Sequence, residues 1–214
     1  MPVPPSQSVR PLGGEQLAKV REVFADGLRH AAASLSEMVG SQVQVLDGRV
    51  DVVPLAGAVG LAGQPEASTV AIYLGITGRF NAHVVLLFAP ADAARLAGLL
   101  LEPASGEAPA DEGLEESALG EVGNVMGSSF ATVLGDLIGS PLWSTPPTVR
   151  TDMARALLDG LVVDVGGGQD RILVVVTQFA RLDAEPRFTV RGTFLVIPEP
   201  DGLTELSAAL DQAP

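Results

Sequence analysis

Four polar side chains recur at helical spacing near the middle of the chain, namely Ser117, Glu121, Asn124 and Ser128. Steps of four, three and four residues place these side chains, the polar stripe, on one face of a helix. Its carboxylate can form an ion pair, and its amide and hydroxyl groups can donate and accept hydrogen bonds. A stripe of this kind is most often an ordinary solvated surface, so its meaning depends on the rest of the chain.

The surrounding stretch, from Asp111 to Pro147, has the pattern of a helix with one buried side. Apolar residues recur every three or four positions opposite the polar stripe, as in a helix packed on a sheet. They are Leu119, Val122, Met126, Phe130, Val133 and Leu137. Gly120, Gly123 and Gly127 flank the polar stripe, and each costs a helix about 1 kcal/mol relative to alanine. We therefore expect another backbone to approach the helix closely at these glycines.

Other groups suited to chemistry are few. The histidines, His30 and His83, lie in unrelated contexts, and we interpret both as ordinary surface or strand residues. The run 166–168 is all glycine but lacks the lysine of a phosphate-binding loop, so we expect a turn between strands. The chain has no cysteine, which excludes disulfides, thiolate metal sites and cysteine nucleophiles. Without a serine-nucleophile motif or a metal-ligand cluster, the sequence does not predict a conventional hydrolase site.

The composition is that of a strongly acidic globular protein. The 214 residues carry a net charge of -13, and 47% of them are hydrophobic. This excess of negative charge argues against nucleic acids and anionic membranes as primary partners, because both attract clustered positive charge. No uninterrupted apolar run is long enough to span a membrane. Met1–Gly14 lacks the features of a secretory signal, so we expect a flexible lead and a cytoplasmic location.

Apolar periodicity and turn residues predict helices and strands in both halves of the chain. In the first half we expect a helix, two hairpins and a second helix. Their ranges are Glu15–Val39, Gln42–Val53 with a turn at Asp47-Gly48, Val70–Thr77 paired with Phe80–Phe88 around Gly78, and Pro90–Leu101. Glu102–Glu112 is rich in proline, glycine and serine, and we expect a linker.

The second half is expected to begin with a long helix that ends at Ile138. A proline-rich turn at Pro146 and Pro147 follows, and then a short helix, three strands and a terminal helix. The ranges after the turn are Thr151–Leu158, Leu161–Val165, Arg171–Phe179, Arg187–Ile197 and a helix that ends near Leu210.

An offset of 99 residues aligns the two long helices without a gap. It pairs Glu22 with Glu121, Ala32 with Ala131, Leu35 with Leu134, and Val39-Gly40-Ser41 with Ile138-Gly139-Ser140. The polar stripe is not shared, because Ala18 lies at the position of Ser117. Ala25 likewise lies at the position of Asn124. We therefore predict two repeats, 15–101 and 113–210, joined by linker 102–112 within one domain. Because the two helices share a buried face but not the polar stripe, we expect the exposed face to have a role that is separate from folding.

At this point the sequence resembles a known family. The order Ser117-x-x-x-Glu121-x-x-Asn124, followed by Pro146, is similar to the phosphatase motif of the CheC, CheX and FliY family of bacterial and archaeal chemotaxis. The text from Glu121 to Leu134 is similar to that family's helix, and so is Ala31–Ser36 in the first repeat. The resemblance covers about residues 16–210, and the two repeats favour the CheC type within the family.

The resemblance implies an α/β fold with pseudo-twofold symmetry, in which two repeats share a central sheet and two long helices lie side by side on one face. It also implies hydrolysis of the aspartyl phosphate of the response regulator CheY in two-component signalling. Asn124 would orient the attacking water, and Glu121 would pair with a lysine of the receiver domain. Ser117 and Pro146 would support them. Mg²⁺ would arrive with the receiver, so no cofactor of the protein's own is expected.

In the first repeat, Ala18, Glu22 and Ala25 form a degenerate site under this comparison, and we predict one working site. Two roles without catalysis stay open. One is an adaptor that binds the receptor deamidase CheD, a partner type of this family. The other is a structural component of the flagellar switch, because the middle domain of FliM shares the fold. Against the second, the chain ends after the second repeat, and Met1–Gly14 contains no CheY-binding peptide.

Overall fold

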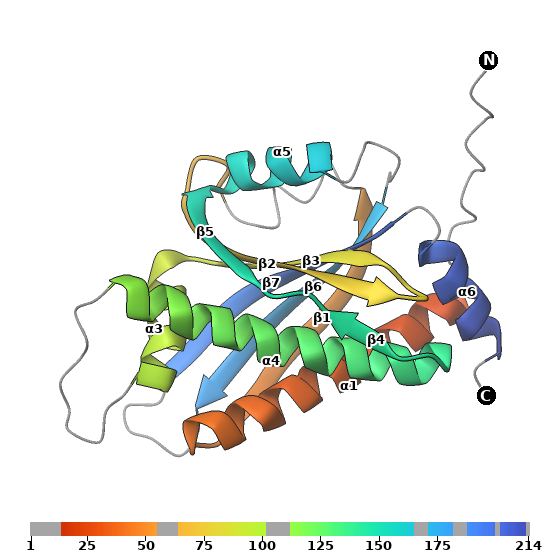
Figure 1. The fold of residues 1–214 in the computed structure, drawn as a ribbon, viewed down its shortest axis with the longest axis horizontal. Helices are drawn as coiled ribbons and strands as arrows, with labels where there is room; N and C mark the ends of the chain where they lie inside the picture. Colours follow the sequence, from red (N-terminus) through yellow and green to blue (C-terminus); the bar gives the residue numbers. More distant parts are fainter. Residues whose placement is uncertain are drawn as a thin grey trace.

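An antiparallel sheet with helices on both faces forms the described part of the protein (Figure 1). The computed structural model describes residues 14–54, 64–101, 112–164, 171–181, 188–199 and 202–212. Its helices are α1 (Gly14–Val39), α3 (Pro90–Leu101), α4 (Glu112–Ile138), α5 (Ala154–Asp164) and α6 (Gly202–Gln212). Its strands are β1 (Val43–Pro54), β2 (Ser68–Gly78), β3 (Ala82–Phe88), β4 (Leu142–Ser144), β5 (Thr148–Met153), β6 (Arg171–Arg181) and β7 (Phe188–Pro198).

The order of the strands interleaves the two halves of the chain. Within the described ranges, six of the seven strands run in the order β1-β6-β7-β3-β2-β4, and the seventh, β5, also pairs with β2. Strand β1 of the first half therefore pairs with β6 of the second half, while β4 and β5 pair with β2 of the first. Each half supplies strands to the edge of the other. Both halves thus belong to one sheet, whereas their division into sequence repeats stays a prediction.

The two faces of the sheet are covered unequally. Alternate side chains of β2, such as Ile72 and Leu74, pack in one large cluster with α1, α3, α4 and α6. The intervening Ala71 belongs to a smaller cluster with Leu158 of α5 on the opposite face. Figure 1 shows α1 and α4 on one side of the strands and α5 on the other. The expected mixed fold, with two long helices on one face, is confirmed.

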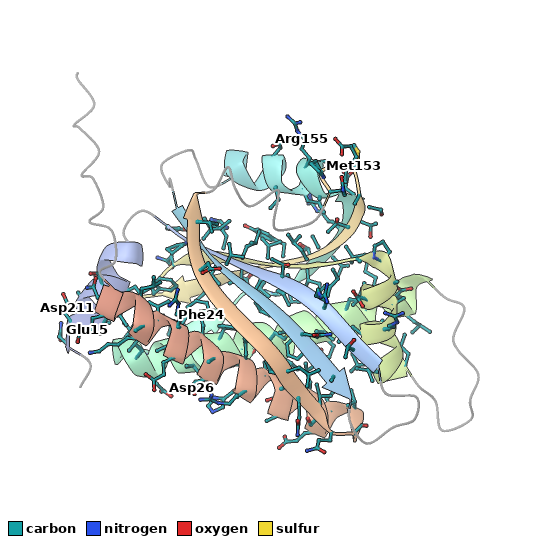
Figure 2. The ribbon with its side chains drawn as sticks, turned by 180° about the vertical axis from the view of Figure 1, so that it is seen from behind. Glu15, Phe24, Asp26, Met153, Arg155 and Asp211 are labelled. Atoms are coloured by element: carbon teal, nitrogen blue, oxygen red, sulfur yellow. The ribbon has the colours of Figure 1, made fainter. Side chains whose placement is uncertain are left out.

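The packing of Phe130 determines which face of α4 is buried. The ring centroid of Phe130 lies 5.4 Å from that of Phe24 in α1 and 5.3 Å from that of Phe194 in β7. All three rings are buried, and Figure 2 shows Phe24 on the inner side of α1. A β-carbon built on Gly27 of α1 would lie 3.1 Å from Phe130 Cε1, so the two helices pack closely there. These contacts lock the rotation of α4 about its own axis.

The expected apolar side of α4 is confirmed in its first part and shifted in its second. Leu119, Val122, Met126 and Phe130 are buried. Beyond them, Leu134 and Ile138 are buried, whereas Val133 and Leu137 are only half-buried. The expected positions already follow the helical period of 3.6 residues, because their three- and four-residue steps average 3.6. The buried positions instead step by four residues after Val122, so the buried side turns gradually around α4.

Both long helices end in the same way. Gly40 after α1 and Gly139 after α4 have φ angles of 62° and 67°, a left-handed conformation that favours glycine. Beyond these glycines, Ser41 N donates to Ser36 O at 3.2 Å, and Ser140 N donates to Gly135 O at 3.0 Å. The offset of 99 residues relates the two caps, so the expected stop of the first helix at Gly40 is confirmed.

Several elements differ from the expected ones. The hairpin at Asp47-Gly48 is wrong, because β1 continues through this dipeptide and pairs with β6 from Val43 to Pro54. The dipeptide instead follows a β-bulge between Val45 and Asp47, where an extra residue interrupts the register. The hairpin of β2 and β3, the helix α3 and strands β6 and β7 are confirmed.

The expected order after Pro147 is also partly wrong. Strand β5 occupies Thr148–Met153, so the helix predicted from Thr151 begins only at Ala154. That helix continues to Asp164, and the strand predicted at Leu161–Val165 is therefore helical over its described part. Branched residues suggested a strand there, but they occur in both kinds of element. The lead (1–13), most of the linker (102–111), residue 165 and the glycine run lie outside the described residues.

Candidate functional site

The polar stripe lies on the exposed face of α4. Ser117, Glu121, Asn124 and Ser128 are all exposed, as their spacing predicts. Because the buried face of α4 packs against β2 and α1, the stripe points away from the sheet. The structure therefore brings the four side chains onto one accessible surface.

Glu121 and Asn124 contact each other within this stripe. Asn124 Nδ2 donates a hydrogen bond to Glu121 Oε2 across 3.4 Å. A bond of this length between exposed groups is weak, because water competes for both partners. The contact orients the amide toward the carboxylate, but a docking partner can replace it at little cost. No hydrogen bond of the Ser117 side chain is found within the described ranges.

Residues 144–147, from the last residue of β4 to the start of β5, form a wall beside α4. Ser144 Oγ lies 3.3 Å from Ser128 Oγ of the polar stripe. The next residue, Thr145, is fixed to β2 by two hydrogen bonds with Gly75. Thr145 N donates to Gly75 O at 2.8 Å, and Gly75 N donates to Thr145 Oγ1 at 2.8 Å. The wall is thus held on the sheet and meets α4 at Ser128.

Two of the three glycines that flank the polar stripe make this close packing possible. A β-carbon on Gly123 would lie 2.6 Å from Ile72 Cγ2 and 3.0 Å from Pro147 Cβ. One on Gly127 would lie 2.9 Å from Leu74 Cδ1. Close approach was expected from another backbone, but side chains make it. A β-carbon on Gly120 would meet nothing within 4 Å, so packing does not explain that glycine.

The two prolines of the wall have different surroundings. Pro147, which sequence reasoning treated only as part of a turn, packs against α4 at Gly123. Pro146, the residue chosen from the family motif, is exposed. It lines a cavity of about 630 Å³ that lies toward α5 and also includes Tyr73 and Arg150. The supporting role of Pro146 stays a prediction, and Pro147 is the proline that touches the helix.

The offset of 99 residues could have revealed this wall. It maps Val43–Pro54 onto Leu142–Met153, which are the bounds of β1 and of β4 together with β5. Pro146 and Pro147 correspond to Asp47 and Gly48, next to the bulge of β1. In the first half the corresponding edge strand, β1, is continuous, whereas the prolines divide it into β4 and β5 in the second half. Because prolines indicate a turn, the sequence did not predict these strands.

The corresponding face of α1 has different chemistry. Ala18 and Glu22 are exposed, and Ala25 is half-buried. At the position that corresponds to Ser128, the chain has Arg29, which forms an ion pair with Asp26 in the preceding turn. This face thus carries a carboxylate but no amide where α4 has Asn124.

The histidines agree with their interpretation as ordinary residues. His30 is exposed on α1. His83 lies on β3, where its Nδ1 is hydrogen-bonded to the hydroxyl of Tyr73 on β2. Neither histidine belongs to α4, on which the polar stripe lies.

The charge of α4 is of one sign. Its sequence contains no lysine or arginine, and its acidic residues are Glu112, Glu115, Glu116, Glu121 and Asp136. An acidic surface attracts a partner with basic groups and repels an acidic one. Among the described residues no group of three histidine, aspartate or glutamate side chains is placed to hold a metal ion. No helix in those same ranges is both long and apolar enough to cross a membrane.

Known proteins resemble this chain in sequence and in fold. The sequence model of the CheC-like family matches residues 114–150, which contain the polar stripe and the wall. A curated relative, the CheY-P phosphatase CheC of Bacillus subtilis, is 21% identical over 198 residues, which cover 92% of this chain and 94% of the relative.

Solved structures share the fold at low sequence identity. FliY of Thermotoga maritima superimposes with a TM-score of 0.65 and 19% identity, over 95% of this chain and 99% of that one. CheX of Borrelia burgdorferi, solved as a complex with CheY, BeF3 and Mg²⁺, has a TM-score of 0.50 and 15% identity, over 83% and 96% of the two chains. The family model and the curated relative confirm the resemblance expected from the motif on α4, and the solved structures of FliY and CheX share the fold.

Proposed function

We propose that this protein is a phosphatase of CheY-P, the aspartyl-phosphorylated response regulator. The observation that carries the proposal is the exposed pair of Glu121 and Asn124 on a helix face that packing fixes. The curated relative from Bacillus subtilis is named a CheY-P phosphatase. A fold relative has been solved with CheY bound. Both names favour a receiver domain as the partner of this protein.

The proposed reaction needs little from the protein itself. Water attacks the phosphorus, the bond between phosphorus and the aspartyl oxygen breaks, and the products are inorganic phosphate and the free aspartate. The receiver brings the phosphoryl group, Mg²⁺ and a lysine as parts of the substrate. Asn124 holds the attacking water through its amide, which can both donate and accept a hydrogen bond. Its short side chain on a rigid helix makes this a positional effect.

Glu121 has the complementary role of docking. Its carboxylate pairs with the lysine of the receiver and thereby sets the register of α4 in the receiver's pocket. The hydrogen bond from Asn124 to Glu121, at 3.4 Å, is weak enough to be exchanged for these new partners. Ser117 and Pro146 are supporting residues in this proposal, and Pro147 fixes the helix against the wall at Gly123.

The protein is proposed to have one working site. Ala25 in α1 stands where α4 has Asn124, so the first helix has no amide to hold the water. Arg29 also places a positive charge at the position of the neutral Ser128, where a basic partner would be repelled. Glu22 alone would provide docking without positioning of the water.

The test is the loss of phosphate from phosphorylated CheY of the same organism, measured with wild type, Asn124→Ala and Ala25→Asn. We expect wild type to accelerate the loss and Asn124→Ala to reduce this acceleration about 100-fold, the usual cost of removing one positioned hydrogen-bonding group. Ala25→Asn is expected to leave the rate near that of wild type, because Ala18 still occupies the position of Ser117 in the first helix. Equal rates for wild type and Asn124→Ala would contradict the proposal.

The roles without catalysis are distinguishable in the same experiment. FliY as a fold relative fits a component of the flagellar switch, and binding of CheD remains the third possibility. If wild type leaves the lifetime of CheY-P unchanged and binds purified CheD, the polar stripe is a recognition surface and the adaptor role replaces the phosphatase role. Binding to switch proteins without either effect would favour the structural role.

A further inference from the structure

Gly120 is a glycine of α4 that close packing does not require. A β-carbon at Gly123, Gly127 or Gly135 would come within 3.0 Å of a neighbouring atom. A β-carbon at Gly120 would meet nothing within 4 Å. Glycine is the least favourable helical residue after proline, so an alanine at this position would stabilise α4 without any clash. The described fold therefore gives no steric reason for a missing side chain at Gly120.

The position of Gly120 connects it to the site. It immediately precedes Glu121 and lies four residues before Asn124, so it borders Asn124 on the helix surface. It is also three residues before Gly123, which touches Pro147 of the wall. The bare surface at Gly120 therefore lies between Asn124 and the side of α4 that faces the wall. A partner that reaches Asn124 must pass over or beside it.

The same position in the first half is covered. The offset of 99 residues places Arg21 of α1 at the position of Gly120. Arg21 Nη2 lies 3.8 Å from Asp51 Oδ1 of β1, so its long side chain extends from the helix to the edge strand. The half that has Asn124 thus has an open helix surface, and the half that lacks it has a bridged one.

We propose that Gly120 is a specificity-determining residue, because its open surface admits a backbone segment of the receiver beside Asn124. This inference rests on the proposed phosphatase function and adds a steric requirement to it. A polypeptide segment can lie against the helix backbone only where no side chain intervenes, as at other glycines where two backbones approach. Contact at Gly120 then sets how deeply Asn124 enters the receiver's pocket, and a small displacement there lowers the rate sharply.

The test compares Gly120 with a glycine of equal freedom elsewhere. Gly98 in α3 also has nothing within 4 Å of an added β-carbon, which makes it the matched control. Gly120→Ala, Gly120→Leu, Gly98→Ala and Gly98→Leu are made in the full chain. Thermal unfolding, dephosphorylation of CheY-P and binding of CheY activated with beryllofluoride are measured for each. All four variants are expected to unfold at or above the midpoint of wild type.

We expect Gly120→Leu to lower kcat/KM about tenfold or more and to weaken CheY binding in parallel, since it displaces the partner. Gly120→Ala has a smaller effect in the same direction, and both Gly98 variants stay within about twofold of wild type. If Gly120→Leu keeps wild-type kcat/KM while Asn124→Ala is inactive, the inference is wrong and the proposed function stands. If wild type neither binds CheY nor shortens the lifetime of CheY-P, both are wrong. A lowered unfolding midpoint confined to the Gly120 variants would also overturn the inference.

Discussion

Replacing Gly123 by alanine tests the close packing of α4 against the wall and the sheet. The added β-carbon would lie 2.6 Å from Ile72 Cγ2 and 3.0 Å from Pro147 Cβ. Carbon atoms in contact normally lie about 3.5–4.0 Å apart, so one of these neighbours must move by about 1 Å. Ile72 is fully buried and Pro147 is a rigid ring, so neither can turn away freely.

Two opposing contributions determine the size of the effect. Overpacking of this kind typically costs about 1–3 kcal/mol. The helix gains about 1 kcal/mol when alanine replaces glycine. The net expectation is a loss of up to about 2 kcal/mol in the free energy of unfolding, which corresponds to a fall of up to roughly 8 °C in Tm for a chain of this size. Gly120→Ala has the same helical gain without a clash, so its Tm should rise by about 2–4 °C.

The measurement is thermal unfolding of wild type, Gly123→Ala and Gly120→Ala under identical conditions, followed by circular dichroism. The two substitutions are chemically identical and only three residues apart in one helix. Opposite signs of the Tm shift are therefore the expected result. A rise in Tm for Gly123→Ala equal to that for Gly120→Ala would refute the reasoning, because α4 would then not be in contact with Ile72 and Pro147.

Three further expectations follow from the same contacts. Phe130→Ala removes the ring between α1 and β7 and should cost about 3–5 kcal/mol in urea unfolding, so a cost below about 1 kcal/mol would contradict its central position. Gly139→Ala places a β-carbon at a φ of 67° with nothing nearby to clash. It should lower Tm through backbone strain of about 1–2 kcal/mol, and an unchanged Tm would contradict the left-handed cap. Because α4 carries only acidic charge, the association rate with CheY in stopped flow should fall as ionic strength rises from about 0.01 M to about 0.15 M, and a rate independent of salt would contradict steering by this face.

The sequence predicted the long helices because several independent signals agreed on them. In α1 and α4 the apolar period, the terminal glycine and the offset of 99 residues all point to the same bounds, and the structure has them. The polar stripe followed from the same reasoning, because a helix with one buried side must expose the other. The exposure of Glu121 and Asn124 was therefore predictable without any knowledge of their function.

The edge strands were not predictable from local pattern alone. Asp47-Gly48 favours a tight hairpin locally, but pairing of β1 with the distant β6 decides its conformation. Pro146 and Pro147 similarly indicate a turn, although strands lie on both sides of them. The role of Pro147 depends on Ile72 and Gly123, which only the fold brings near it. Contacts between distant segments thus account for what sequence reasoning missed.

The most direct test of the central claim separates the roles of Asn124 and Glu121. Initial rates of CheY-P hydrolysis are measured over a range of CheY-P concentrations for wild type, Asn124→Ala and Glu121→Ala. The account predicts that Asn124→Ala lowers kcat about 100-fold with KM nearly unchanged, because the amide acts only on the attacking water. It predicts that Glu121→Ala mainly raises KM, because the carboxylate docks the receiver. The opposite assignment, or rates for both variants equal to that of wild type, would contradict the account.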